Sequence, residues 1–521
     1  MNKISRRNFS KTLTAGLGAA AINPIKGFAV KDTKSTSIKK KPNIVFICSD
    51  QHSYKYTGYA GHNLVKTPNL DRIAKRGVVF TDTYSGNPVS VPGRTGMMTG
   101  MFPSDCNSFC NSTVWDGSHP VWGTYLKNEG YYCRAIGKLD LNKDFDMGFD
   151  EIETSHGHWS DPDVTSLFRR PVAYRSNELG NVNGGSRKER HGDAKKTELG
   201  LKFLKEESAK LKKPWALWLG LSEPHPKFVA LEEYYNLYPE YNIDMPNIPA
   251  GHLEDLHLVF QELRHFKRIA NPISEDKIRR ARAAYYGMIT ELDEYIGKVW
   301  DELERTDELK NTLFIYTSDH GESLGEHGLW LKNNLYDVAN RVPLVMAGAG
   351  LPENVRINTP VGHIDIVATM LELAGSDAFN KLRGKSLLPL LKGESTGGPQ
   401  FAFSESHSEG NCTGSFMIRK GDWKYIHFTW YSDLLFNVAK DPGEFNNLID
   451  KPDTAEIQVE LTGILNSLLN PEEVTLRAFH AQEKILADFS EQMTEEQLFE
   501  LFKGRFGPGQ ARALAKKCKR V

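Results

Sequence analysis

The sequence predicts an α/β fold with a large, mostly parallel mixed sheet flanked by helices, followed by a smaller antiparallel-sheet subdomain. Between residues 40 and 395, short apolar runs alternate with segments of helical periodicity, which is typical of parallel α/β sheets. Three of the apolar runs lead into Asp or His, at Asp50, His225 and Asp319. Beyond about residue 401 the runs become short and alternating, with turn residues between them, which favours antiparallel strands.

The predicted strands are continuous apolar runs, as expected for strands buried on both faces of a parallel sheet. They lie in PNIVFICSD (42–50), PWALWLGLSEPH (214–225) and NTLFIYTSDHG (311–321). Helical spacing of apolar residues is found in TPNLDRIAKRG (67–77) and AAYYGMITELDEYIGKVWDELE (283–304). Ligands of open α/β sheets bind beyond the carboxyl ends of the strands, so the Asp and His residues there are expected to share one site.

Four segments are expected along the chain. Residues 1–30 join a basic start to a mildly apolar stretch too short to span a bilayer, and the run SRRNFSK at 5–11 resembles a twin-arginine export signal. A catalytic domain is expected over 40–395, the small-sheet subdomain over 396–470 and a charged helical tail over 471–521, where Thr494 to Gln497 fits a capping box. The mature protein is therefore expected to be periplasmic or secreted, with the export machinery as a partner.

The overall composition excludes several classes of protein. The 65 Lys and Arg residues balance 66 Asp and Glu residues, so no global field favours nucleic acid or an anionic membrane surface. No window is long and apolar enough for a transmembrane helix, so no stable membrane insertion is expected. The six cysteines form no CxxC pairs; a disulfide framework is not expected, although Cys106 and Cys110 are close enough in sequence to bridge.

The strand-end residues Asp50, Gln51, Asp319 and His320 form an oxygen-rich set that suits a hard divalent cation. Calcium fits this set better than zinc, while magnesium and manganese stay open. A second candidate is Ser90, in GNPVSVPGRTGMMTG (86–100), which is either the cap of a helix or the centre of the chemistry.

The segment SVPGR at 90–94, followed by TGMMTG, resembles the signature of the type I sulfatases in the alkaline phosphatase superfamily. Further segments match in the family's order, and together they cover about 42–448: NIVFICSDQ, TPNLDRIAKRGVVFTDTY, GKLDLN, PHP, SDHGESLGEHGLWLKNNLYDVANRVPL, HIDIVATMLELAG, GKSLLPLL and LFNVAKDPGEFNNL. The resemblance implies an alkaline phosphatase/sulfatase-like fold and a sulfuric ester hydrolase that acts on a sulfated polysaccharide or oligosaccharide, for example an algal polymer such as ulvan.

The resemblance also implies a mechanism. Ser90 is expected to be oxidised to formylglycine by a radical maturase, because a serine hydroxyl alone is a poor nucleophile. One hydroxyl of the hydrated aldehyde then attacks sulfur and expels the alcohol, and the second collapses to release sulfate. The residue roles implied are the following: Arg94, Lys138 and Lys332 hold the modified side chain and the sulfate oxygens, His225 protonates the leaving alcohol, and Asp50, Gln51, Ser90, Asp319 and His320 bind one Ca²⁺ ion per chain.

Two positions depart from the family pattern. Gln51 stands where many relatives have a second acidic residue, and Asp140 stands where relatives with GK-x-H have histidine. Asp140 lowers the local positive charge and is expected to accept a hydrogen bond from a sugar hydroxyl. The other expected substrate-binding residues lie in a predicted long loop or close to Lys332: His156, His158, Trp159, Arg169, Arg170, Arg175 and His327.

Two other functions stay open from the sequence. The same scaffold supports hydrolysis of phosphodiesters or phosphonate monoesters. A catalytically silent protein that binds sulfated glycans, with Ser90 unmodified, is the third hypothesis.

Overall fold

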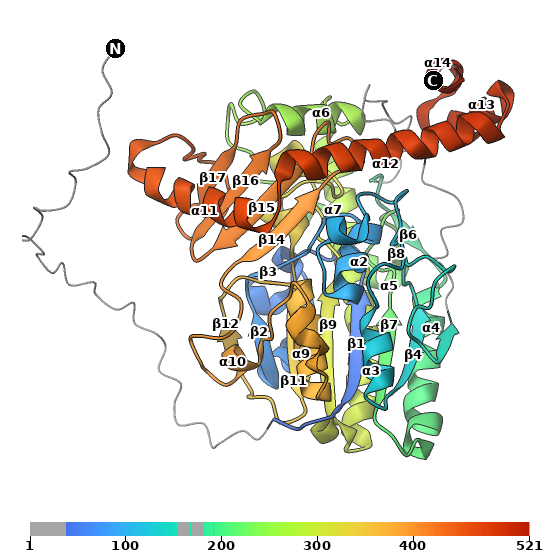
Figure 1. The fold of residues 1–521 in the computed structure, drawn as a ribbon, viewed down its shortest axis with the longest axis vertical. Helices are drawn as coiled ribbons and strands as arrows, with labels where there is room; N and C mark the ends of the chain where they lie inside the picture. Colours follow the sequence, from blue (N-terminus) through green and yellow to red (C-terminus); the bar gives the residue numbers. More distant parts are fainter. Residues whose placement is uncertain are drawn as a thin grey trace, which may run out of the picture. The chain divides into compact units, whose positions relative to one another are not determined.

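One central sheet of eight strands carries the site, in the order β12-β2-β11-β9-β1-β7-β4-β5 (Figure 1). The computed structural model describes residues 38–153, 164, 167, 174, 182–190 and 192–519, so the expected export signal lies outside the described residues. The strand bounds are β1 Asn43–Ser49, β2 Gly77–Phe80, β4 Tyr132–Gly137, β5 Glu151–Glu153, β7 Trp215–Gly220, β9 Thr312–Ser318, β11 Leu344–Gly348 and β12 Val355–Ile357.

The expectation of a mostly parallel mixed sheet is confirmed. Only β11 runs against its neighbours β2 and β9, and every other pair in the sheet is parallel. At the centre, Ile44 of β1 pairs with Ala216 of β7 and Leu313 of β9, and all three strands are buried along their length. Since the carboxyl ends of β1, β7 and β9 are adjacent, the residues that follow these strands are brought together.

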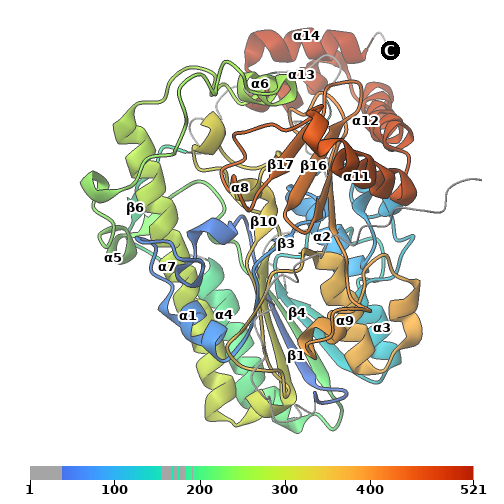
Figure 2. The ribbon, with the colours of Figure 1, turned by 90° about the vertical axis from the view of Figure 1, so that its left-hand side faces the viewer.

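Helices cover both faces of this sheet. The bounds on one face are α1 Pro68–Lys75, α4 Gly192–Lys202 and α7 Glu275–Arg305, and on the other α2 Ser90–Thr99, α3 Trp122–Asn128 and α9 His363–Ala374 (Figure 2). The side chains of β1 alternate between the two cores: Val45 and Ile47 pack on the α1 and α7 side, whereas Ile44 and Phe46 pack on the α2 and α3 side. The predicted helices α1 and α7 are confirmed.

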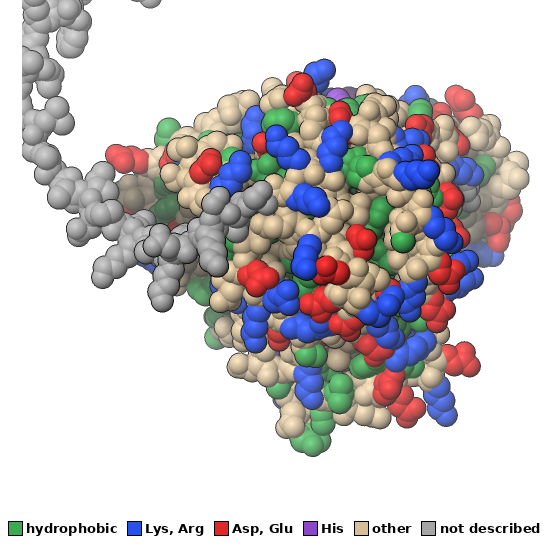
Figure 3. All heavy atoms as spheres, turned by 90° about the horizontal axis from the view of Figure 1, so that it is seen from below, with side chains coloured by type: hydrophobic (Ala, Val, Ile, Leu, Met, Phe, Trp, Pro, Cys, Tyr) green, Lys and Arg blue, Asp and Glu red, His purple; other side chains and the backbone are tan. Residues whose placement is uncertain are grey.

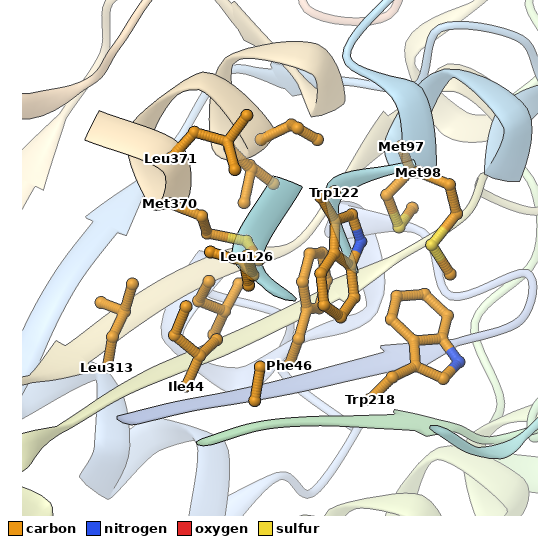
Figure 4. Close-up of a cluster of buried hydrophobic side chains, with 14 of the residues drawn as sticks. Ile44, Phe46, Met97, Met98, Trp122, Leu126, Trp218, Leu313, Met370 and Leu371 are labelled. Atoms are coloured by element: carbon orange, nitrogen blue, oxygen red, sulfur yellow. The ribbon is translucent and has the colours of Figure 1, made fainter. Parts of the chain in front are cut away.

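The core between the sheet and α2, α3 and α9 fixes the helix that carries Ser90. Met97 and Met98 extend from α2 into this core (Figure 4). The other residues labelled there are Ile44, Phe46, Trp122, Leu126, Trp218, Leu313, Met370 and Leu371. Burial of such side chains stabilises by roughly 1.5–3 kcal/mol each, so α2 is held firmly against the strand ends.

The second sheet is antiparallel, as predicted from the alternating runs. Its four strands, in the order β14-β15-β16-β17, are Ala402–Ser406, Ser415–Lys420, Trp423–Phe428 and Leu434–Asn437. The helices that follow are α11 Ala455–Leu468, α12 Pro471–Gln492, α13 Glu495–Phe506 and α14 Pro508–Cys518. The predicted capping box is present, because Thr494 and Gln497 each accept the other's backbone N–H.

The remaining strands and α-helices are mostly short. A small sheet in the order β10-β3-β13 consists of Arg341–Val342, Thr83–Tyr84 and Val361–Gly362, and β6 Ser186–Arg187 pairs with β8 Ala230–Leu231. The remaining helices are α5 Glu232–Tyr235, α6 Leu258–Phe266, α8 Asp337–Asn340 and α10 Leu388–Leu391.

The charges on the surface are mixed, as the nearly equal numbers of basic and acidic residues lead one to expect. Figure 3 shows basic and acidic side chains intermixed over the face in view, with no broad region of one sign.

All six cysteines are described and form no disulfide, so Cys106 and Cys110 do not bridge. None of the helices in the described part of the chain combines the length and apolarity needed to cross a bilayer.

His62 is expected to make stability depend on pH. Its Nδ1 accepts the backbone N–H groups of Leu64 (3.2 Å) and Val65 (3.1 Å), so it must be unprotonated there. Burial lowers the pKa of His62 to about 4, against opposing attraction from Asp244. Because the folded pKa lies below the usual 6.5, the stabilisation is complete above about pH 6.5 and is lost as the pH falls toward 4.

The His62→Asn variant tests this expectation, since its amide oxygen can still accept but does not titrate. The drop in thermal unfolding midpoint between pH 7.5 and pH 5.5 should be smaller than for the unsubstituted protein. His480→Asn is the matched control, because His480 is 75% exposed. Equal drops for all three proteins would contradict the assignment.

Candidate active site

The structure excludes Ser90 as the cap of α2. Val89, with extended φ and ψ of −147° and 141°, is the N-cap of α2, and Ser90 is the first helical residue, making no capping hydrogen bond. The Ser90 hydroxyl Oγ instead accepts from Lys332 Nζ at 2.9 Å and lies 3.1 Å from His320 Nε2. The cap interpretation is therefore wrong, because the helix starts one residue earlier than the sequence pattern indicated.

Three predicted metal ligands meet beyond the central strands. Asp50 follows β1, Asp319 and His320 follow β9, and all three are fully buried, with one ligand atom from each within 4.8 Å of the others. Asp50 Oδ1 accepts no hydrogen bond from any described residue, although such burial is costly without a partner. An oxygen left in this way beside a second carboxylate and an imidazole nitrogen fits a divalent cation.

Gln51, which follows Asp50 in the chain and bonds to Asp319, carries a further buried oxygen. Its backbone N–H donates to Asp319 Oδ1 at 3.0 Å, and its side-chain Nε2 donates to Glu322 Oε2 at 2.5 Å. The amide oxygen Oε1 is buried and accepts no hydrogen bond from the described residues. The sequence pattern assigned no role to Glu322, although it stands two residues after His320 in the SDHGE segment.

Two cations compensate the carboxylates: Arg94, which is fully buried, and Lys138, which is partly buried. Arg94 Nε donates to Asp319 Oδ2 at 2.9 Å, and Arg94 Nη1 donates to the Lys138 carbonyl oxygen at 3.1 Å. Lys138 Nζ donates to Asp50 Oδ2 and lies 3.0 Å from Asp140 Oδ2. Burial alone would lower the pKa of Lys138, but the carboxylates of Asp140 and Asp50 raise it above its usual value. Lys138 is therefore a cation within the site.

His320 is held as a neutral ring. Burial, and after it the charge of Lys332, lower the pKa of His320 well below its usual value. Its Nδ1 lies 3.0 Å from the Gly321 carbonyl oxygen, which can only accept, so the proton is on Nδ1. The Nε2 lone pair is consequently directed at Ser90 and Lys332, as a metal ligand requires.

His225 lies in the segment after β7, where the Glu223 carbonyl oxygen accepts the backbone N–H of Asp50 at 3.3 Å. The His225 side chain is partly exposed, and its Nδ1 lies 2.7 Å from the Pro226 carbonyl oxygen. Burial of the ring lowers the pKa of His225 to about 4, and the charges of Asp50 and Lys332 act on it in opposite directions. The structure thus brings His225 into the electrostatic reach of the residues around Ser90.

A network of polar side chains extends from the residue after Ser90 to the residue after Lys332. The N–H of Val91 donates to Asn111 Oδ1 at 3.2 Å, and Asn111 Nδ2 donates to Glu409 Oε1 at 2.8 Å. Asn333, next to Lys332, donates to the second oxygen of Glu409 at 3.2 Å. Glu409, in the loop between β14 and β15, therefore joins the start of α2 to the segment that carries Lys332, which no local sequence pattern signalled.

Not every predicted substrate-binding residue lies at this cluster. His327 stacks on Tyr336 with ring centroids 3.8 Å apart, and its Nδ1 lies 2.9 Å from His252 Nε2. It lines a separate cavity of about 430 Å³. Asp140 is 1% exposed and lies with Lys138 and Arg94. The other predicted residues lie outside the described residues: His156, His158, Trp159, Arg169, Arg170 and Arg175.

Positively charged side chains beside a buried hydroxyl, such as Lys332 beside Ser90, are suited to the hydrolysis of anionic esters. The family comparisons agree: the profile described as Sulfatase matches residues 42–376, and that of the C-terminal region of N-sulphoglucosamine sulphohydrolase matches residues 325–470. The chain belongs to the sulfatase family and is a sulfuric ester hydrolase.

Curated relatives support this membership. The chain is 30% identical to choline-sulfatase of Rhizobium meliloti (strain 1021) over 440 residues, which covers 81% of this chain and 85% of the relative. It is 29% identical to arylsulfatase K of Gallus gallus over 463 residues, covering 82% of this chain and 83% of the relative.

Solved structures confirm the fold. Phosphonate monoester hydrolase of Agrobacterium radiobacter superposes with a TM-score of 0.67 at 24% identity, covering 82% of this chain and 95% of that one. A 2-O GAG sulfatase superposes with a TM-score of 0.65 at 23% identity, covering 82% and 92%. At such identities the likeness concerns the fold alone.

Asp140→Asn is expected to tighten the binding of inorganic sulfate. The change removes a negative charge 3.0 Å from Lys138 Nζ and leaves Lys138 paired with Asp50. Since the family resemblance assigns Lys138 to the sulfate oxygens, removal of the negative charge beside it is expected to lower the sulfate dissociation constant by about tenfold. Titration calorimetry measures it, with Asp301→Asn as a control at a side chain 62% exposed. An unchanged constant for Asp140→Asn would contradict the expectation.

Proposed function

We propose that this sulfatase hydrolyses sulfate esters of a sulfated carbohydrate, with formylglycine made from Ser90 and one divalent cation, calcium first among the candidates. The observation that carries the proposal is the placement of the Ser90 hydroxyl, 2.9 Å from Lys332 Nζ and 3.1 Å from His320 Nε2 instead of in a helix cap. A side chain held between a lysine and a neutral imidazole is positioned for reaction with a bound anion.

The residues of this chain would divide the work. Bound in place, the cation and the oxidised side chain would supply Lewis acidity and an oxygen nucleophile. Lys138, which is paired with Asp50, and Lys332, which donates to Ser90, would hold sulfate oxygens, a task suited to compact ammonium groups. Arg94 would keep Asp319 ionised and in place through its 2.9 Å contact. His225, after protonation, would donate to the leaving oxygen.

A carbohydrate substrate is supported by structural neighbours. One is a 2-O GAG sulfatase, and another was solved in complex with its substrate D-glucosamine-2-N,6-O-disulfate. An algal polymer such as ulvan is the narrower candidate within this class.

Maturation and export complete the proposal. The twin-arginine-like run at 5–11 supports export to the periplasm or beyond, and the serine at position 90 supports a radical maturase as partner. Export of a folded protein is compatible with modification of Ser90 before transport.

Mass spectrometry on the tryptic peptide 77–94 tests the nucleophile. Protein from its native host should show the loss of two hydrogen atoms at Ser90. Ser90→Ala should fold, with a change in the free energy of unfolding of about 1 kcal/mol, because only hydrogen bonds to Lys332 and His320 are removed. Its release of sulfate should fall to background. An unmodified serine in active protein would sink the formylglycine assignment.

A substrate panel separates the remaining functions. Sulfate release from sulfated oligosaccharides should exceed that from choline sulfate and an aryl sulfate, and phosphate or phosphonate monoesters should react more slowly. Faster turnover of phosphonate esters would favour the hydrolase alternative. Retention of sulfated glycan without any sulfate release, by native-host protein in which Ser90 is unmodified, would favour a binding protein.

Removal of the cation should abolish turnover. Chelation followed by added Ca²⁺ should remove and then restore activity, because Asp50 Oδ1 and Gln51 Oε1 have no other partner among the described residues. Asp319→Asn should weaken Ca²⁺ binding and lower the free energy of unfolding by roughly 3 kcal/mol, since buried Arg94 loses its closest carboxylate. Full activity after exhaustive chelation would remove the metal from the scheme.

A further inference from the structure

We propose that Glu322 is a positioning residue that fixes the side-chain amide of Gln51 with its oxygen toward the cation, and so sets the affinity of the site for that cation. The inference rests on the metal centre of the proposed function. It concerns a residue that binds neither cation nor substrate.

The contacts of Glu322 define its role as an acceptor. The side chain is fully buried. Its Oε1 accepts the backbone N–H groups of Leu324 at 2.8 Å and Leu331 at 2.7 Å, and its Oε2 accepts Gln51 Nε2 at 2.5 Å. Each of these three groups is an N–H donor, so the carboxylate form satisfies all three contacts.

This acceptor selects one of the two orientations of the Gln51 amide. A rotation by 180° would place amide oxygen against carboxylate oxygen, and two acceptors repel at hydrogen-bond distance. The NH₂ group must therefore face Glu322, which leaves Oε1 as the end without a hydrogen-bond partner among the described residues. A cation can be bound by that oxygen and not by the NH₂ group.

The backbone of Gln51 is fixed on both sides. Its N–H donates to Asp319 Oδ1 at 3.0 Å, and its carbonyl oxygen accepts from the Tyr285 hydroxyl at 2.7 Å. With the backbone held, the side-chain torsions of Gln51 are its remaining freedom, and the hydrogen bond to Glu322 fixes the end of the side chain. The negative charge of Glu322 also polarises the amide, which makes its oxygen a better ligand although Gln51 itself is neutral.

Calcium binding by Glu322→Gln tests the proposal. A glutamine at 322 can present either an oxygen or an NH₂ group to Gln51, so part of the molecules would turn the Gln51 NH₂ group toward the cation. The dissociation constant for Ca²⁺ alone, measured by calorimetry on metal-free full-length protein, should rise by about 10- to 100-fold. The Ca²⁺-dependent rise in the thermal unfolding midpoint should shrink in parallel.

An exchange of the two side chains separates positioning from packing. In the double variant Gln51→Glu, Glu322→Gln, the amide at 322 donates to a carboxylate at 51, whose second oxygen faces the cation. The hydrogen bond and the total charge of the pair are kept, so Ca²⁺ affinity should return to within about threefold of the unsubstituted protein. A packing defect at position 322 would not be repaired by a change at position 51.

Two further variants keep the test decisive. Glu291→Gln is the matched control, because Glu291 is also fully buried and bonds to Tyr295 and Arg187 away from the cluster; its Ca²⁺ affinity should be unchanged. Gln51→Met leaves both backbone bonds of Glu322 intact and should lower Ca²⁺ affinity by about tenfold, even if Glu322→Gln does not fold.

The outcomes distinguish this inference from the proposed function. Unchanged affinity in Glu322→Gln or in Gln51→Met, or a double variant as weak as Glu322→Gln, would overturn the positioning role while the metal centre stands. A lack of saturable Ca²⁺ binding by the unsubstituted protein would reject both. Weak binding by Glu322→Gln and Gln51→Met, with recovery in the double variant, supports the inference.

Discussion

The candidate site depends on the positive charge of Arg94, because three buried carboxylates lie around its guanidinium group. Its nitrogens lie 2.9 Å from Asp319, 3.5 Å from Asp140 and 3.8 Å from Asp50, and each of these side chains is at most 1% exposed. Like charges buried together are strongly unfavourable unless a cation lies among them. Since Arg94 is part of α2, the helix that presents Ser90 and the charge balance of the strand ends are fixed together.

Close approach of α2 to the strand ends depends on Gly93. A Cβ atom at this position would lie 2.7 Å from the Asn87 carbonyl oxygen and 3.3 Å from that of Asp319, so any larger residue would push the helix away. The same approach places the Ser90 hydroxyl against Lys332 and His320. The short distance between α2 and the ends of the central strands thus determines both the backbone packing and the position of Ser90.

The sequence predicted those parts of the structure that depend on short stretches of neighbouring residues. A continuous apolar run with Asp50 or Asp319 at its end indicates both a buried strand and the edge at which its last side chain lies. Glu322 was missed because its role depends on a hydrogen bond to a residue 271 positions away. His327 is close in sequence to Lys332, but the intervening turn directs it to a different cavity.

The Glu409 contacts have a consequence for how the enzyme is made. Asn111 bonds to a residue 298 positions later in the chain, and Asn333 to the same residue 76 positions later. A ribosome must therefore synthesise most of the polypeptide before the surroundings of Ser90 can close. Until then this serine belongs to an open chain segment, whereas in the finished fold it is 2% exposed. Translation itself sets a time window during which position 90 is accessible to another enzyme.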